Sequence, residues 1–262
     1  MIKTTGTITD TKYSSSGDVV ILTVRPDELF DFSEGQFMML ETQIDGEMVM
    51  RAYSIYSTDR QLGEEETVSF CIKRKESGVF STRATQQARV GWKMKLTWPV
   101  GRFTDDEKSM HYLFISVGSG LSPCYSIYQS LLHSGRYDKI TNIFGERYSS
   151  HIPDEVLDAY SIQTDKISNQ IFLSREEENS QSLPRSTAGQ VIHNSQFIKG
   201  YVQDGLSSAL DFLWLLENDK VPSHHNTNIT VFICWLPAMC DDVRDKLIDY
   251  GIARERLIIE KY

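Results

Sequence analysis

The strongest constraint on the fold is a change of pattern near residue 104, where short strands separated by turns give way to strands that alternate with helices. Before this point, apolar and polar residues alternate in short runs that end at Gly, Asp or Ser, which is typical of antiparallel strands. Asp45-Gly46 lies between two such runs and predicts a hairpin. A single helical segment follows residue 78. We therefore expect a small antiparallel β-barrel over residues 1–105.

Residues 106–262 have a different pattern. Buried-type strands such as HYLFISV (111–117) and NITVFICW (228–235) each run into a segment with helical periodicity. Repeated strand–helix units build a parallel sheet with helices on both faces. The polar stretch 176–200 fits neither element type, and we expect it to be a loop. The sequence thus predicts two domains, an N-terminal antiparallel β-barrel and a C-terminal α/β domain with a Rossmann-like parallel sheet.

Charge and composition exclude several classes of protein. A net charge of −9 disfavours nucleic-acid binding, which needs a basic surface. No run approaches the ~20 apolar residues of a membrane helix, and the N-terminus lacks the apolar core of a signal peptide, so we expect a cytoplasmic protein. The four cysteines have no CxxC spacing, which argues against a disulfide framework, a structural zinc site or an iron–sulfur cluster, and we expect no metal in the site.

Two short motifs have the residue types that bind nucleotides. RAYS (Arg51 to Ser54) ends a barrel strand, where Arg51 can hold a phosphate and Tyr53, on the same face, can stack on an aromatic ring. The glycine-rich turn Gly118–Pro123 follows a buried strand and opens a helix, whose free N–H groups favour phosphate. Each motif alone is also compatible with a solvent-exposed strand or a plain turn.

Taken in order, the motifs resemble the ferredoxin–NADP⁺ reductase superfamily. RAYSIYS is similar to its flavin motif, SGVFST to its FAD-pyrophosphate loop and PVGRF to the segment that closes its barrel. GSGLSP matches its nicotinamide-nucleotide turn, CWLPAM its Cys-Gly-x-Pro-x-Met turn, and the final EKY the Glu-x-Tyr end of the plant-type branch. The resemblance covers essentially the whole chain and is weakest over 176–200.

The resemblance implies two cofactors, FAD and a nicotinamide dinucleotide. The residues expected to hold FAD at the barrel edge are Arg51, Tyr53, Ser54, Gly78, Val79, Phe80, Ser81, Thr82 and Tyr262. Those expected to bind the nicotinamide dinucleotide across the cleft are Gly118, Ser119, Gly120, Pro123, Ser174, Arg175 and Tyr201. The task of the protein is then to position the two rings for hydride transfer.

The same resemblance implies four catalytic residues. Ser54 is expected near the flavin ring, where its hydroxyl stabilises developing charge, and Tyr262 is expected to cover the flavin until the nicotinamide displaces it. Glu260 is expected to relay protons. Cys234 is expected to pack beside the nicotinamide; no base lies near it in sequence, so it is not a candidate nucleophile.

The choice between NADP(H) and NAD(H) depends on the adenosine end of the site. By the resemblance, Ser174 and Arg175 meet a 2′-phosphate, and Tyr201 stacks on adenine. A 2′-phosphate requires cationic or hydrogen-bonding partners, so these residues favour NADP(H). Glu176 is an acid of the kind that binds ribose hydroxyls, which keeps NAD possible.

No second redox centre is recognisable in the chain, so the resemblance implies an external one-electron carrier such as ferredoxin or flavodoxin. Seven basic residues against one acid lie in one stretch: Lys73, Arg74, Lys75, Arg83, Arg89, Lys93 and Lys95. They form either a docking patch for an acidic carrier or an ordinary solvated face. Two other functions stay open: an NADH-dependent flavin or haem-protein reductase, and a subunit that keeps the fold without turnover.

Trp98 and Trp235 both stand where the family has glycine. Glycine permits tight backbone geometry that a tryptophan crowds. One hypothesis is a gene that reads a stop codon as glycine and has been translated with tryptophan; codons at the two positions test it, and plain UGG at both rejects it. The alternative is a divergent site with an altered cleft.

Overall fold

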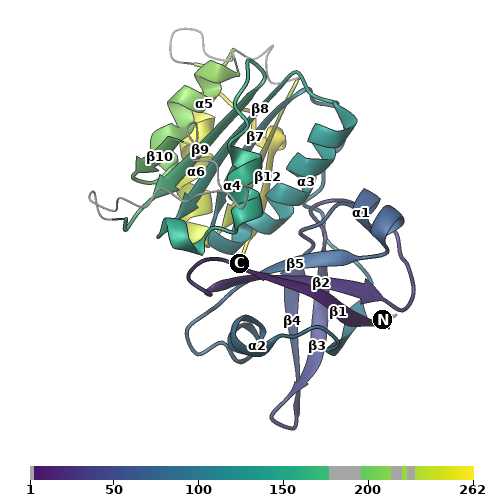
Figure 1. Ribbon diagram of the computed structural model, residues 1–262. Coiled ribbons are helices and arrows are strands. Elements are labelled where there is room, and N and C mark those ends of the chain that lie inside the picture. Colours follow the sequence, from purple (N-terminus) through teal and green to yellow (C-terminus); the bar gives the residue numbers. More distant parts are fainter. Residues whose placement is uncertain (1–2, 177–195, 214–219, 223–227) are drawn as a thin grey trace.

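The computed structural model describes residues 3–176, 196–213, 220–222 and 228–262, and its strands form two six-stranded sheets (Figure 1). Among these residues no helix is long and apolar enough to cross a membrane. Within the same residues, no group of three or more His, Cys, Asp or Glu side chains is placed to hold a metal ion.

The first sheet is antiparallel and has the strand order β4-β3-β6-β1-β2-β5. Its strands are β1 (Lys3–Tyr13), β2 (Val19–Pro26), β3 (Phe37–Ile44), β4 (Glu47–Ser54), β5 (Val68–Lys73) and β6 (Lys93–Thr97). Asp45 and Gly46 have φ of 50° and 88°, the left-handed pair that a two-residue hairpin needs. The two edge strands, β4 and β5, approach each other just after β4 ends. There the Tyr56 N–H donates a hydrogen bond of 2.8 Å to the carbonyl of Ser69 in β5. The sheet therefore curls into the predicted barrel around a buried apolar core.

Two helices accompany the barrel. The predicted helix is α2 (Val79–Gln87), and the sequence pattern missed α1 (Asp59–Glu65). Only Leu62 of α1 is buried, so the helix has no apolar periodicity to reveal it. Its start is instead fixed by Thr58, whose hydroxyl accepts the Gln61 N–H at 3.3 Å.

The second sheet is parallel and has the order β10-β9-β8-β7-β11-β12, as predicted for the α/β domain. Its strands are β7 (His111–Val117), β8 (Lys139–Glu146), β9 (Ile167–Leu173), β10 (Gln196–Lys199), β11 (Ile229–Trp235) and β12 (Leu257–Lys261). The prediction of a loop over residues 176–200 was wrong at the C-terminal end of this stretch, because Gln196–Lys199 forms strand β10 and pairs with β9. Residues 177–195 lie outside the described part of the chain.

Helices cover both faces of the parallel sheet (Figure 1). They are α3 (Leu121–Ser134), α4 (Asp154–Tyr160), α5 (Leu206–Phe212) and α6 (Pro237–Asp249), with short 3₁₀ turns η1 (Gly118–Gly120), η2 (Ser149–His151), η3 (Val202–Gly205) and η5 (Arg254–Arg256). Strand residues alternate between the faces: Phe114 packs in the core that contains α3 and α4, and Ile115 in the core that contains α5 and α6.

The two domains share apolar packing. Ile21 and Cys71 of the barrel belong to the same buried cluster as Leu121 and Cys124 of α3. The barrel's β6 ends at Thr97 and β7 begins at His111, so the boundary predicted between residues 105 and 106 falls in the connection and stays a prediction. This packing places the ends of β4 and β5 opposite the carboxyl ends of β7 and β8.

The strand order also fixes where a ligand can enter the parallel sheet. From β7 the chain moves outward to β8, β9 and β10, and then returns to place β11 on the other side of β7. In open α/β sheets the crevice at such a switch point, outside the carboxyl ends of the strands, is the preferred binding position. The glycine-rich turn η1 lies at this point, directly after β7.

Candidate active site

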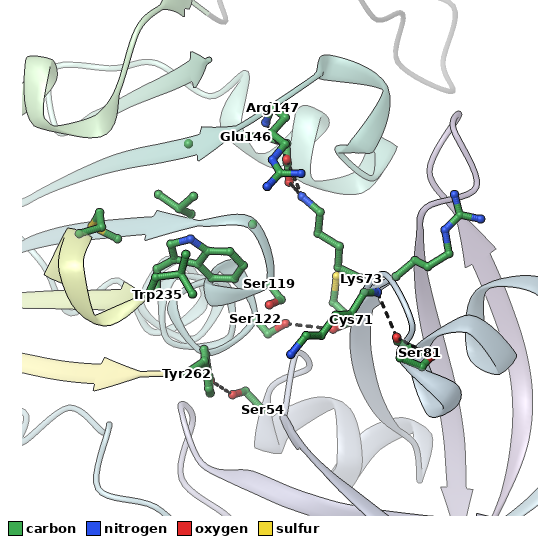
Figure 2. A pocket seen from close by; sticks show the side chains of 18 of the residues that line it. Ser54, Cys71, Lys73, Ser81, Ser119, Ser122, Glu146, Arg147, Trp235 and Tyr262 are labelled. Carbon is green, nitrogen blue, oxygen red and sulfur yellow. Dashed lines mark hydrogen bonds and ion pairs between the residues drawn. The ribbon is translucent and has the colours of Figure 1, made fainter. Parts of the chain in front are cut away.

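A cavity of about 910 Å³ lies between the barrel and the parallel sheet (Figure 2). The barrel contributes the end of β4, the end of β5 and the start of α2 to its lining. The parallel sheet contributes the carboxyl ends of β7, β8, β9 and β11, and the last residue of the chain completes it. A volume of this size suits a cofactor or a pair of small ligands.

The barrel edge presents the RAYS motif to the cavity. Arg51, Tyr53 and Ser54 all line it. The Arg51 side chain is exposed and donates to the Met50 carbonyl at 2.8 Å, and no ion pair joins it to an acid among the residues that the structure describes. The ring of Tyr53 lies 5.2 Å from that of Phe80, tilted by 39°, which fixes its position against α2.

The start of α2 forms a tight loop with unpaired N–H groups. Gly78 is the N-cap and no side chain caps the helix, so the N–H groups of the first turn have no intrahelical partner. A Cβ at Gly78 would lie 2.5 Å from the Ser81 hydroxyl and 3.0 Å from the Lys75 carbonyl, so any other residue would require the loop to shift. The predicted residues here that line the cavity are Gly78, Val79, Phe80 and Ser81; Thr82 does not line it.

The glycine-rich turn is packed against β11. Gly118 has φ of +55°, and a Cβ there would lie 2.9 Å from the indole of Trp235. A Cβ at Gly120 would lie 2.2 Å from the Cys234 carbonyl oxygen. Gly118 and Ser119 line the cavity, whereas Gly120 and Pro123 are buried and do not. The glycines therefore permit close packing of the turn on β11.

The predicted adenosine end is only partly assembled at the cavity. Ser174 and Tyr201 line it, and Tyr201 is 65% exposed. Arg175 is exposed and lies outside the lining. The Glu176 carboxylate accepts hydrogen bonds from the Ser149 N–H at 2.9 Å and the Ser149 hydroxyl at 3.1 Å, and so is directed toward η2.

The C-terminal tyrosine joins the two domains. The Tyr262 N–H donates to the Trp235 carbonyl at 3.1 Å, and its hydroxyl is hydrogen-bonded to Ser54 across the cleft and to Glu260 at 3.2 Å. Although 48% of Tyr262 is exposed, its hydroxyl end lies between Ser54 and Glu260. Burial there raises the pKa of the phenol and of the Glu260 carboxyl.

Cys234 is completely buried and does not line the cavity. Burial raises the pKa of its thiol well above the ordinary value, so the thiolate that a nucleophile requires is disfavoured. Its sulfur lies 3.3 Å from the position of a Cβ at Gly120, so it packs against the glycine-rich turn. Its contact with a nicotinamide ring stays a prediction.

Sequence reasoning missed a group of charged side chains between the domains, here called the interface charge cluster: Asp18, Lys73, Arg74, Glu146 and His151. The Lys73 amine, at the end of β5, lies 2.5 Å from both carboxylate oxygens of Glu146, at the end of β8. His151 is 3.4 Å from Glu146 and 3.3 Å from Asp18, which also pairs with Arg74. Nothing local in the sequence signals this contact between distant strands.

The charge of Glu146 is stabilised where it is buried. Burial acts to raise the pKa of Glu146, but the hydrogen bond from His151 and the charge of Lys73 outweigh it and hold this pKa below the ordinary value. The backbone N–H of Arg147 donates to the same carboxylate at 2.6 Å. The carboxylate therefore stays ionised and binds the two domains together.

The basic stretch from Lys73 to Lys95 does not present all of its charges freely. Lys73 is paired with Glu146, and the Lys95 amine lies 3.3 Å from Glu41. Lys75, in contrast, is exposed and lines the cavity. Docking of an acidic carrier on this stretch stays a prediction.

Comparison with known proteins gives the following matches. Residues 7–104 match the family model of the oxidoreductase FAD-binding domain. The chain is 28% identical to ferredoxin–NADP reductase B of Sorangium cellulosum over 237 residues, which are 89% of this chain and 86% of that protein. It is 33% identical to a component of 1,2-phenylacetyl-CoA epoxidase of Escherichia coli over 125 residues, 47% of this chain and only 34% of the longer relative.

Among solved structures, the fold is similar to a ferredoxin NADP⁺ reductase from Neisseria gonorrhoeae that contains bound FAD and NADP. The TM-score is 0.76, with 17% sequence identity, and the match covers 99% of this chain and 98% of the other. The similarity of fold thus extends over both domains.

Proposed function

Because the chain belongs to the ferredoxin–NADP⁺ reductase superfamily of FAD- and NAD(P)-binding oxidoreductases, we propose that it transfers electrons between NADP(H) and an external one-electron carrier protein. The observation that carries this proposal is the single cavity shared by four separate motifs. The end of β4, the start of α2, the glycine-rich turn and the terminal tyrosine all line it.

The residues of the barrel edge fit a flavin dinucleotide. Arg51 offers a guanidinium that is paired with no acid in the described part of the chain, and the first turn of α2 offers N–H groups without intrahelical partners, which together suit a pyrophosphate. The tight loop at Gly78 allows the backbone to approach such a group closely. Tyr53, held against Phe80, offers an aromatic face. Bound FAD would supply the redox chemistry, since a flavin accepts a hydride and releases electrons singly.

The chain's own residues would position the nicotinamide and move protons. Tyr262 closes the cleft through its hydrogen bond to Ser54, so it must move aside for a nicotinamide ring to enter. Glu260 has a raised pKa and lies 3.2 Å from the Tyr262 hydroxyl, which suits a carboxyl that holds and passes on a proton. Ser54 would donate its hydroxyl to developing charge once Tyr262 has moved.

NADP(H) is favoured over NAD(H) by the surroundings of Glu176. An NAD site usually offers a free acid to the ribose hydroxyls, but the Glu176 carboxylate accepts two hydrogen bonds from Ser149. Ser174 lines the cavity beside it and can donate to a 2′-phosphate, and exposed Tyr201 can stack on adenine.

The proposed partner is an acidic one-electron carrier such as ferredoxin or flavodoxin. Lys75 is an exposed cation at the cavity, so a carrier that docked over it would come close to the bound flavin. Complementary charge speeds this kind of encounter. Carrier reduction should therefore slow as salt concentration rises.

A visible spectrum of the purified protein, followed by anaerobic titration with NADPH, tests the proposal. We expect flavin absorbance that NADPH bleaches, and transfer of the electrons to added ferredoxin or flavodoxin. Faster turnover with NADH and a flavin or haem-protein acceptor would favour the alternative reductase. Colourless protein that takes up no FAD would support a subunit without turnover.

A matched pair of variants locates the flavin. Arg51→Met is expected to lower FAD content, because it removes the exposed guanidinium at the cavity. Arg25→Met, at an exposed arginine of β2 outside the cavity lining, is the control and should retain FAD. Equal FAD content in the two variants would contradict the proposed position of the cofactor.

A further inference from the structure

Trp235 lies directly on the glycine-rich turn. It ends β11 at the point where the strand order switches, next to β7. A Cβ at Gly118 would lie 2.9 Å from Cη2 and 3.3 Å from both Cζ2 and Cζ3 of the indole, so the six-membered ring covers this glycine. Figure 2 shows the indole on the cavity side of the turn, near Tyr262.

The backbone of Trp235 is held on both sides. Its carbonyl accepts the Tyr262 N–H at 3.1 Å and the Cys240 thiol at 3.5 Å. The strand itself is hydrogen-bonded between β7 and β12. The indole can therefore leave the turn only by rotation of its side chain and not by a shift of the strand.

The glycine-rich turn can approach a dinucleotide only where its backbone is uncovered. With the indole in place, the approach to Gly118 is filled by aromatic carbon. The adenosine end is different: Ser174 and Tyr201 line the cavity, and Tyr201 is 65% exposed. The obstruction thus falls on one half of the proposed nucleotide site.

We propose that Trp235 is an affinity-determining residue that occludes the nicotinamide half of the NADP(H) site, and that its indole rotates away when the full dinucleotide binds. This inference rests on the proposed function. The apparent affinity of a ligand equals its intrinsic affinity multiplied by the fraction of protein that is in the binding-competent conformation. A minor conformer is typically ~0.1–10% populated, so removing the ring should raise NADP⁺ affinity about tenfold or more.

Calorimetric titration with NADP⁺ and with 2′,5′-ADP tests this proposal. NADP⁺ reaches both halves of the site, whereas 2′,5′-ADP occupies the adenosine half alone. Trp235→Gly is expected to bind NADP⁺ about tenfold more tightly than the wild type, and to bind 2′,5′-ADP with unchanged affinity. Trp235→Ala removes the same ring while keeping a Cβ, and is expected to give the same ratio.

Trp98→Phe is the control, because Trp98 packs against Phe30 with ring centroids 5.7 Å apart and does not line the cavity. This variant should bind both nucleotides like the wild type. Tryptophan fluorescence gives a second measurement: NADP⁺ should change the emission of the wild type and of Trp98→Phe, but much less that of Trp235→Ala.

The outcomes separate the two proposals. Unchanged or weaker NADP⁺ binding by both Trp235 variants, with 2′,5′-ADP still bound, would overturn the occlusion and leave the proposed function standing. If no protein, wild type included, binds either nucleotide, the proposed function itself fails.

Discussion

The ion pair between Lys73 and Glu146 is expected to be a principal bond between the two domains. It joins β5 of the barrel to β8 of the parallel sheet, 73 residues apart in the chain. The Glu146 side chain is 3% exposed and that of Lys73 is 19% exposed. Both residues line the cavity, but the carboxylate is almost fully buried whereas the lysine side chain keeps some exposure. This asymmetry predicts that the two partners are not equally costly to remove.

Lys73→Met leaves a buried carboxylate without its cation. Breaking a buried pair in this way costs about 3–5 kcal/mol, and we expect the low end, about 3 kcal/mol, because His151 and the Arg147 N–H still hydrogen-bond to Glu146. Glu146→Gln costs less, about 1.5 kcal/mol, because the freed Lys73 amine can reach water in the cavity. The double variant should cost less than the sum of the two single variants.

Thermal unfolding measures this difference. For a chain of this size, 1 kcal/mol lowers Tm by about 2–4 °C, so Lys73→Met should lower it by about 6–12 °C and Glu146→Gln by about 3–6 °C. Lys95→Met is the control; its pair with Glu41 is exposed on the lysine side and is worth at most about 1 kcal/mol. A Lys73→Met variant as stable as Lys95→Met, or less affected than Glu146→Gln, would refute the reasoning.

Three further predictions follow from the same geometry. The folded pKa of Glu146 lies below its ordinary value of 4.5, so its contribution is complete above pH 4.5 and is lost as pH falls further; acid titration should therefore destabilise Glu146→Gln less than the wild type. Gly120→Ala places a Cβ 2.2 Å from the Cys234 carbonyl and should lower stability by about 1–3 kcal/mol, measurable by urea unfolding, whereas an unchanged midpoint would contradict the packing. All four cysteines are buried, and burial raises their thiol pKa values, that of Cys71 to about 12. The folded protein should resist N-ethylmaleimide and label fully after unfolding; mass spectrometry that finds rapid native labelling of Cys234 would refute this.

Most of the fold follows from local pattern. Period-two alternation with Asp45-Gly46 predicts the β3–β4 hairpin, and buried strands followed by helices predict the parallel sheet, because both signals lie within one or two elements. The two missed elements lack such signals. Helix α1 buries only Leu62, and β10 is a four-residue strand whose existence depends on pairing with β9.

Some predicted site residues converge on the cavity because they follow neighbouring parallel strands. Ser119 follows β7 and Ser174 follows β9, and the carboxyl ends of parallel strands meet at one edge of a sheet. Arg51 lines the same cavity from antiparallel strand β4 of the barrel. The contact of Lys73 with Glu146 depends instead on how two domains face each other. The direction of the Trp235 indole depends on side-chain packing against a turn in another element. Neither has a sequence period or a spacing that could reveal it.

These two unpredicted features together indicate how a nucleotide enters the cleft. Opening the cleft by moving the domains apart would break the buried pair of Lys73 and Glu146, at about 3–5 kcal/mol, and would expose the apolar cluster that the domains share. Among the described residues, rotation of Trp235 and Tyr262 breaks no ion pair, and the bond that it breaks across the cleft is the hydroxyl–hydroxyl hydrogen bond between Tyr262 and Ser54. Side-chain rotation is therefore the less costly route, and the Lys73–Glu146 contact should persist when NADP⁺ is bound. A structure of the NADP⁺ complex in which these two side chains have separated, while Trp235 still covers Gly118, would contradict this route.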